Sequence, residues 1–202
     1  MRSVVMSSKK SVYIVLTSTS TYLSQAIKFF TNERLCHVSI AFDKELKEVY
    51  SFGRKDQRNP FIGGFVQENL NGPVFSHAYC AIYKIDVDTA NYLLMRSRIY
   101  HFHTHAHLYR YNFIGLIPVM FNIEWNRKNH YFCSQFVNDI LEHGHVRLFN
   151  KPSVLIKPAD FKNSHLELIY KGSLMNYLQV IEEQLDENND TNTINNNYKL
   201  VR

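Results

Sequence analysis

Cysteine is scarce in this chain, and its scarcity limits what the cysteines can do. Only three cysteines occur among 202 residues. So small and odd a number argues against a disulfide framework and predicts a reducing compartment. Cys36 and Cys80 lie in apolar, strand-like runs, which is typical of core residues. Cys133 instead stands where an amphipathic helix is predicted to begin.

Long apolar runs are also missing. No stretch approaches the roughly 20 apolar residues of a membrane-spanning helix. Residues 1–10 hold no apolar segment followed by a small-residue cleavage site, and the apolar run at 12–16 is too short to be one. We therefore expect a cytoplasmic protein without an integral membrane segment. Export by a route that the sequence does not reveal stays open.

The excess of positive charge is small. Lys and Arg number 23 against 18 Asp and Glu, which gives a net charge of +5. The basic residues are spread along the chain and form no dense tract of the kind found in nucleic-acid binders. We expect a solvated basic surface and no nucleic-acid partner. Contact with anionic lipid or a cell-wall polymer stays open.

Glycine is sparse, and neither Gly53 nor the pair at 63–64 matches a nucleotide-binding fingerprint. The pair predicts a flexible or a tight place in the backbone. Hydrophobic residues make up 45% of the chain and charged residues 20%, as in a soluble globular protein. We predict a flexible N-terminus over 1–10, one domain over 11–185 and a disordered, Asn-rich tail over 186–202.

Strands and helices are mixed along the predicted domain. Short β-rich runs predict strands, and apolar residues at helical spacing behind a capping residue predict helices. The predicted strands cover 12–16, 35–42, 48–52, 77–87 and 165–170, and the predicted helices cover 22–30, 88–100, 129–141 and 173–185. The strands at 35–42 and 48–52 flank a polar turn, which indicates a hairpin. This order is typical of an α+β fold.

Residues 109–125 are aromatic and apolar, and Gly115 and Pro118 interrupt them. We predict that they form an irregular wall of the core or of a substrate groove. Tyr111 and Trp125 are candidates to line such a groove, although aromatic residues in runs of this kind more often belong to the core.

Cys133 and His37 are the two residues with the most chemical meaning. At a helix N-terminus, unpaired N–H groups and the helix dipole favour negative charge, which lowers the pKa of a thiol. His37 lies in a predicted strand far upstream. A histidine brought beside the thiol would complete a nucleophile and base pair. The alternative is that Cys133 is a small buried hydrophobe.

A run of histidines suggests a second kind of chemistry. Histidine occupies alternate positions at 101, 103, 105 and 107. In a strand all four would share one face, whereas in a helix His101 would pair with His105 and His103 with His107. A metal site is conceivable, but no CxxC or HExxH pattern supports it. A solvated helix end is the simpler interpretation, and we predict no metal and no cofactor.

Several segments, taken in order, resemble one known group. They are HVSI at 37–40, VYSFGRK at 49–55, PFIGGFV at 60–66, YNFIGL at 111–116, YFCSQFV at 131–137 and KPADF at 157–161. The set resembles the circularly permuted, papain-fold cysteine amidases of the NlpC-like superfamily (the YiiX/YaeF-like group). The resemblance covers most of 12–180. It implies a papain-like α+β domain in which a small antiparallel sheet packs against the cysteine-bearing helix.

The resemblance also implies roles for individual residues. Cys133 would be the nucleophile and His37 the base of a thiol hydrolase that acts through an acyl-enzyme. The Cys133 backbone N–H at the helix start is a natural oxyanion donor. The substrate would be an amide, such as a peptide, a cell-wall peptide or an N-acyl group. Acyl transfer, thioester hydrolysis and lipid-acyl hydrolysis are alternatives at the same site.

The resemblance also implies a third catalytic residue that orients His37. The family carries a polar residue on the strand after the histidine strand, and Ser51 is the nearest candidate, although it brings no charge to stabilise an imidazolium. Glu48 is a rival on the opposite face of that strand. Tyr131 and Tyr111 are assigned to substrate binding, where Tyr131 could assist the oxyanion or simply pack. Because Ser51 is a weak orienting group, a catalytically inactive binding module of the same fold is a further alternative.

Overall fold

The computed structural model describes residues 8–18, 34–55 and 62–199, and of these only the backbone for 188–199. It is a mixed α and β fold, as the sequence predicts. The strands are β1 (Lys9–Thr17), β2 (His37–Ala41), β3 (Val49–Arg54), β4 (Gly63–Gln67), β5 (Tyr79–Asp88), β6 (Arg110–Tyr111), β7 (His130–Tyr131) and β8 (Glu167–Ser173). The helices are α2 (Thr89–Thr104), α3 (Leu116–Met120), α4 (Cys133–His143), α5 (Leu174–Lys199) and the short 3₁₀ turns Ser153–Leu155 and Pro158–Asn163.

One six-stranded sheet organises the fold, with the strand order β4-β3-β2-β1-β5-β8. Every neighbouring pair in it is antiparallel. The predicted hairpin of β2 and β3 is confirmed, since Ile40 pairs with Tyr50 and Ala41 with Val49. A separate two-stranded sheet pairs β6 with β7 in parallel, and β7 ends one residue before Phe132, the N-cap of α4.

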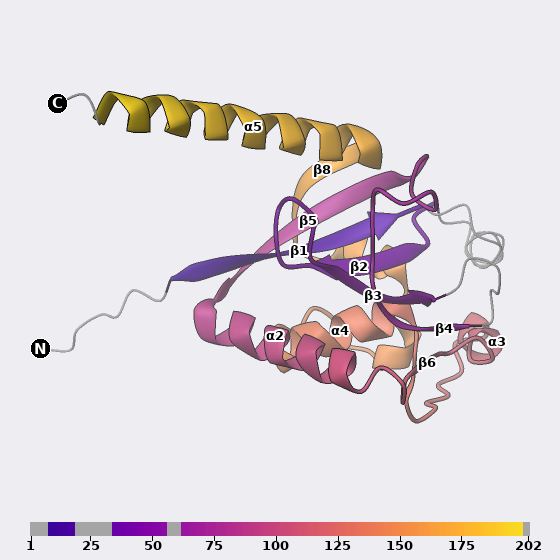
Figure 1. The fold of residues 1–202 in the computed structure, drawn as a ribbon. Coiled ribbons are helices and arrows are strands. Elements are labelled where there is room, and N and C mark those ends of the chain that lie inside the picture. The colour runs from indigo at the N-terminus through magenta and orange to yellow at the C-terminus, as the bar shows by residue number, and fades with distance from the viewer. Residues whose placement is uncertain (1–7, 19–33, 56–61, 200–202) are drawn as a thin grey trace, which may run out of the picture.

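Helices cover both faces of the large sheet (Figure 1). Helices α2 and α4 pack on one face, over a core that includes Leu16, Ile40 and Phe136. Helix α5 lies on the other face, where its residues Leu174, Tyr177 and Ile181 join a second core. Strand residues alternate between these cores because successive side chains point to opposite faces.

Aromatic rings fix α4 against the sheet. The ring centroid of Phe136 lies 5.2 Å from that of Phe52 and 5.1 Å from that of Phe102. Phe65 of β4 joins the group at 5.8 Å from Phe136. Offset and edge-on contacts at these separations stabilise aromatic pairs beyond their burial. The start of α4, and with it the cysteine, is therefore held by contacts to β3, β4 and α2.

Strand β4 is not predicted by the sequence, because two glycines open it and glycine disfavours strands. The glycines are required by close packing. A Cβ on Gly63 would lie 2.7 Å from Cβ of Tyr111, and a Cβ on Gly64 would lie 2.9 Å from the carbonyl oxygen of Tyr109. Of the two alternatives for this pair, the structure favours a tight backbone site.

Two predicted helices end later than expected. Helix α2 runs to Thr104 and therefore takes in part of the histidine run. The backbone of α5 stays helical to Lys199, through most of the stretch for which the sequence predicts disorder. The predicted helix at 22–30 lies outside the described residues. Among the helices that the structure describes, none is both long and apolar enough to cross a bilayer.

Residues 109–125 are expected to form a wall of the core or of a substrate groove, and only the beginning of the segment belongs to the core. Tyr109 and Tyr111 are buried, but Ile114 is 58% exposed and Phe121 is 70% exposed. No residue of α3 is buried. Apolar composition alone does not distinguish a surface turn from a core segment, so the sequence leaves the burial of these residues undecided.

Candidate active site

Cys133 is the first residue of α4 and is almost completely buried, with 3% of its surface exposed. The extended backbone of Phe132, the N-cap residue, precedes it, and the Phe132 N–H donates to Oε1 of Gln135 at 3.4 Å. The hydroxyl of Ser134 donates to the carbonyl oxygen of Ile156 at 2.5 Å. These contacts hold the first turn in place. Its N–H groups have no intrahelical acceptor and are available as hydrogen-bond donors at the helix start.

His37 is the first residue of β2, and its imidazole lies within hydrogen-bonding reach of the Cys133 side chain, which influences its pKa. Its Nε2 atom lies 2.7 Å from Oε1 of Glu68. Because Nε2 faces this carboxylate, Nδ1 is the ring nitrogen left for the thiol. The structure therefore brings together the two residues that the sequence pairs across almost a hundred positions.

Glu68 completes this group of side chains, and no local sequence pattern identifies it. It follows β4 directly, and its backbone N–H donates to the carbonyl oxygen of Val49 at 2.8 Å, which continues the pairing with β3. Its side chain is 8% exposed. Glu68 could be found only from the pairing of β4 with β3. Once residues 63–67 pair with β3, the carboxylate that follows β4 lies beside His37 of β2. Because β4 is not predicted, neither is Glu68.

Ser51 occupies a different place from the one that the sequence assigns to it. Its hydroxyl donates to Oε1 of Glu68 at 2.7 Å, and the hydroxyl of Ser39 donates to Oε2 at 2.5 Å. Ser39 also lies 3.3 Å from Nε2 of His37. Ser51 thus contacts the carboxylate, and the carboxylate contacts the imidazole. Both serines are buried, so they replace the water that a charged carboxylate would otherwise bind.

Strand alternation explains how the serines meet the carboxylate. Val38 and Ile40, which flank Ser39, face the core under α2 and α4. Tyr50 and Phe52, which flank Ser51, face the same core. The two serines therefore point to the opposite face of the sheet. His37, at the strand end, reaches both this polar cluster and the thiol of α4.

The charges of His37 and Glu68 shift each other's pKa. Burial alone would lower the pKa of His37, but the charge of Glu68 and hydrogen bonds to Cys133 and Glu68 raise it well above 6.5. Burial would raise the pKa of Glu68, but the charge of His37 and hydrogen bonds from His37 and the two serines lower it below 4.5. Each shift therefore favours the charged form of its group, the imidazolium of His37 and the carboxylate of Glu68.

Tyr111 also lies near the thiol. It is buried, its ring centroid is 6.1 Å from that of Phe132, and its titration is influenced by Cys133 and Cys36. Burial, then the charges of these two cysteines, raise its pKa well above 10.0. The hydroxyl consequently keeps its proton and is available as a donor.

Tyr131 and Glu48 point elsewhere. The ring of Tyr131 packs 5.1 Å from that of Phe52, and its hydroxyl donates to Oδ2 of Asp139 at 3.4 Å. Of its two predicted roles, these contacts favour packing. Glu48 pairs with Arg96 of α2. Among the described residues, neither Tyr131 nor Glu48 forms a contact with His37.

The histidine run lies at the C-terminal end of α2, where His101 pairs with His105 as expected for a helix. The rings of His101 and His105 stack with centroids 4.5 Å apart, and Nε2 of His101 lies 3.1 Å from the hydroxyl of Tyr109. Across the described ranges, no three His, Cys, Asp or Glu side chains gather so that they could hold a metal ion.

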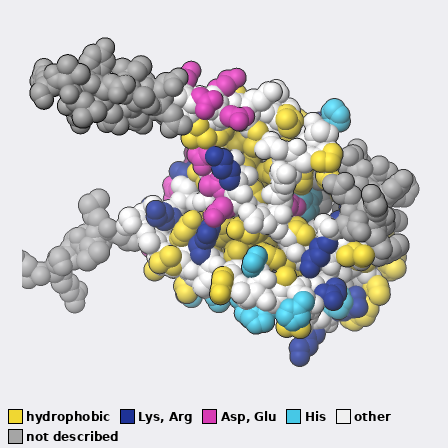
Figure 2. Space-filling model, in the orientation of Figure 1, with side chains coloured by type: hydrophobic (Ala, Val, Ile, Leu, Met, Phe, Trp, Pro, Cys, Tyr) yellow, Lys and Arg dark blue, Asp and Glu magenta, His cyan; other side chains and the backbone are white. Residues whose placement is uncertain are grey.

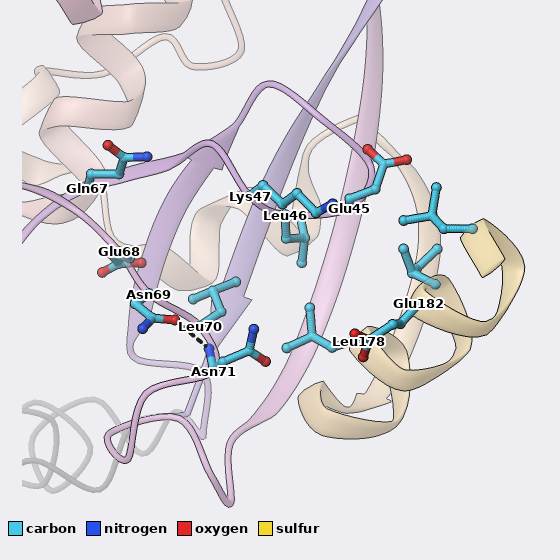
Figure 3. Close-up of a pocket in the computed structure, with 12 residues that line it drawn as sticks. Glu45, Leu46, Lys47, Gln67, Glu68, Asn69, Leu70, Asn71, Leu178 and Glu182 are labelled. Atoms are coloured by element: carbon cyan, nitrogen blue, oxygen red, sulfur yellow. Dashed lines mark hydrogen bonds between the residues drawn. The ribbon is translucent and has the colours of Figure 1, made fainter. Parts of the chain in front are cut away.

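A pocket of about 500 Å³ lies between the β2–β3 turn, the segment after β4 and α5 (Figure 3). Leu46, Leu70 and Leu178 form part of its apolar wall, and Lys47 and Glu182 stand at its edge. Glu68 belongs to its lining, but its carboxylate is taken up by His37 and the two serines. Cys133 and His37 do not line this pocket, so it is separate from the place where the thiol would meet a substrate.

Comparison of the chain with protein-family models, with curated proteins and with solved structures finds no match.

We predict that Glu68→Gln destabilises the protein most between pH 4.5 and pH 6.5. The pKa of His37 is raised in the folded state. The charged histidine therefore contributes fully to the unfolding free energy below pH 6.5, and this contribution is lost as pH rises through its folded-state pKa. The pKa of Glu68 is lowered in the folded state. The charged carboxylate therefore contributes fully to the unfolding free energy above pH 4.5, and this contribution is lost as pH falls through its folded-state pKa. Urea unfolding of wild type and variant across pH measures the difference.

Glu48→Gln is the matched control, because it removes a carboxylate that pairs with an arginine and not with a histidine. Its effect on the unfolding free energy should stay constant as pH rises above 6.5. If the effect of Glu68→Gln is equally constant there, the imidazolium and carboxylate are not paired in the folded protein.

Proposed function

We propose that the protein is a thiol hydrolase that cleaves an amide bond, with Cys133 as nucleophile, His37 as acid and base, and Glu68 as the residue that orients His37. The observation that carries the proposal is the continuous chain of contacts from the Cys133 thiol through the imidazole to the Glu68 carboxylate, at 2.7 Å for the last contact. This order of nucleophile, base and orienting acid is the arrangement that activates a catalytic cysteine.

The reaction follows from these positions. An imidazolium beside the thiol favours the thiolate, whose sulfur attacks the carbonyl carbon and forms a C–S bond. The oxyanion that results accepts a hydrogen bond from the Cys133 N–H at the helix start. His37 gives its proton to the leaving nitrogen, and the C–N bond breaks. The imidazole then takes a proton from water, which attacks the thioester, releases the acid and restores the thiolate.

Glu68 improves both halves of this cycle. Its charge stabilises the imidazolium, and its hydrogen bond to Nε2 turns Nδ1 towards the thiol. Ser39 and Ser51 hold the carboxylate from its two oxygens and are positioning residues. Serine at the place expected for the orienting group is the reason to consider an inactive binding module. A carboxylate in contact with His37 supplies the charge that serine lacks, and this favours an active site.

The finer fold assignment belongs to the same proposal. We assign the domain to the papain-like fold in its circularly permuted, NlpC-like form, because the histidine strand β2 precedes the cysteine helix α4 along the chain. The packing of α4 on β2 and β3 agrees with that form. The three cysteines are unpaired, which suits a reducing compartment, and we place the protein in the cytoplasm.

The substrate proposal is a peptide, a cell-wall peptide or another N-acyl amide. The same thioester intermediate serves thioester or lipid-ester hydrolysis, and it serves acyl transfer when an acceptor replaces water. These alternatives share every step up to the acyl-enzyme, so a test of acylation applies to all of them.

Acylation is tested with p-nitrophenyl acetate, followed by mass spectrometry of the intact protein and of its proteolytic peptides. We expect one acetyl group on Cys133 in the wild type, none on that peptide in Cys133→Ala, and acylation slowed at least about 100-fold in His37→Ala. Cys80→Ser is the matched control, because Cys80 is buried and burial raises its pKa to about 12. Acylation of Cys133 at the wild-type rate without His37 would refute the proposed pair.

Tyr111 is proposed to donate its hydroxyl hydrogen to the charge that develops beside Cys133. We predict that Tyr111→Phe lowers the rate of acylation by about tenfold to 100-fold, because it removes one donor from a water-excluded site. Tyr109→Phe removes a hydroxyl that contacts His101 and should leave the rate unchanged. Single-turnover kinetics with the same ester compare the variants, and equal rates for wild type and Tyr111→Phe would assign Tyr111 to packing alone.

A further inference from the structure

An apolar rim stands on the surface around α3. It consists of the large apolar side chains of Ile114, Ile117, Met120, Phe121, Ile123 and Trp125, all of which are at least 39% exposed. Single exposed apolar residues are normal on protein surfaces, but a contiguous group of them marks a surface that binds another molecule. The rim includes six of the nine exposed residues of this kind that follow Tyr100 in the described chain.

The rim is built on an ordered turn. The N–H groups of Phe121 and Ile123 both donate to the carbonyl oxygen of Pro118, at 3.0 and 2.9 Å. The N–H of Asn122 donates to Val119 at 3.1 Å, and Asn122 has a φ of 55°. The backbone closes on itself, and the apolar side chains project outward from it.

Basic side chains flank the rim. Arg110 precedes it and Arg127 and Lys128 follow it, whereas Glu124 is the one acidic residue between 110 and 128. Arg127 lies over the Trp125 ring at 5.5 Å from its centroid and donates to Oδ1 of Asn112 at 3.2 Å. In the described part of the chain, none of the three basic residues forms an ion pair. Figure 2 shows dark blue and yellow side chains close together at the end of the molecule where α3 lies.

We propose that the apolar rim is a docking surface for an anionic lipid membrane. Isoleucine, phenylalanine and tryptophan side chains enter the boundary between headgroups and acyl chains, and basic residues beside them attract anionic headgroups. The charge favours lipid over a second copy of this chain, because two copies meeting through this surface would bring their unpaired basic residues together.

The rim lies close to the candidate nucleophile. The ring of Phe113, next to Ile114, is 4.7 Å from that of Tyr111, and Tyr111 in turn contacts Phe132, the residue before Cys133. Docking would therefore hold the thiol near the membrane surface. Membrane binding itself does not depend on the thiol or on the proposed hydrolysis.

Vesicle co-sedimentation of the full chain tests the proposal, with vesicles of phosphatidylcholine containing about 30% phosphatidylserine. We expect the wild type to bind them, to bind pure phosphatidylcholine at least about tenfold more weakly, and to be released as salt rises from about 0.1 M to about 0.5 M. Cys133→Ala should bind as the wild type does, which separates this result from the test of catalysis.

Two pairs of variants locate the binding surface. Ile117→Asp with Phe121→Asp should weaken vesicle binding at least about tenfold. The matched control is Leu93→Asp with Leu168→Asp, which adds the same charge at exposed apolar residues of α2 and β8. Arg127→Gln with Lys128→Gln should also weaken binding, and Lys171→Gln should not.

Three results would overturn the proposal. They are absence of binding by folded wild type, equal binding by the rim variant and its control, and a wild-type dimer that the rim variant converts to a monomer. The last result, seen by light scattering, would assign the rim to contact between two copies of the chain.

Discussion

The contact between His37 and Glu68 is the interaction on which the site depends. A charged pair removed from water is stable only when its remaining hydrogen-bonding groups are satisfied. Here both carboxylate oxygens of Glu68 accept hydrogen bonds from buried serines, and the imidazole is shared between Glu68 and Cys133. Four segments must be in register for these contacts to form, so the chemistry of the site is a consequence of how the sheet is assembled.

The sheet provides that register from both sides. On one face, the aromatic contacts of Phe136 with Phe52 and Phe102 set the position of α4 and hence of the thiol. On the other face, the pairing of β3 with β4 carries Glu68 to the end of β2, beside Ser51. His37 lies at the end of β2, where its side chain reaches groups positioned by both faces of the sheet. A change in either core would move one end of the chain of contacts relative to the other.

Local patterns predict much of this arrangement but not all of it. The strands β1, β2, β3, β5 and β8 follow from β-rich runs, and the choice of Cys133 and His37 follows from a thiol at a helix start and a histidine on a strand. Glu68 escapes prediction because β4 opens with two glycines, which close packing against β6 requires. The surface position of α3 escapes because apolar composition does not distinguish a core segment from an exposed one. Both depend on contacts between distant segments.

The most direct test of an activated Cys133 is its rate of alkylation by iodoacetamide, in protein with Cys36 and Cys80 replaced by serine. The imidazole acts on the thiol only if the two side chains meet as the structure places them. We predict that at about pH 7 this protein reacts at least about tenfold faster than the same protein carrying His37→Ala. Equal rates at every pH would contradict the account, because the cysteine would then be a buried core residue and His37 would have no influence on it.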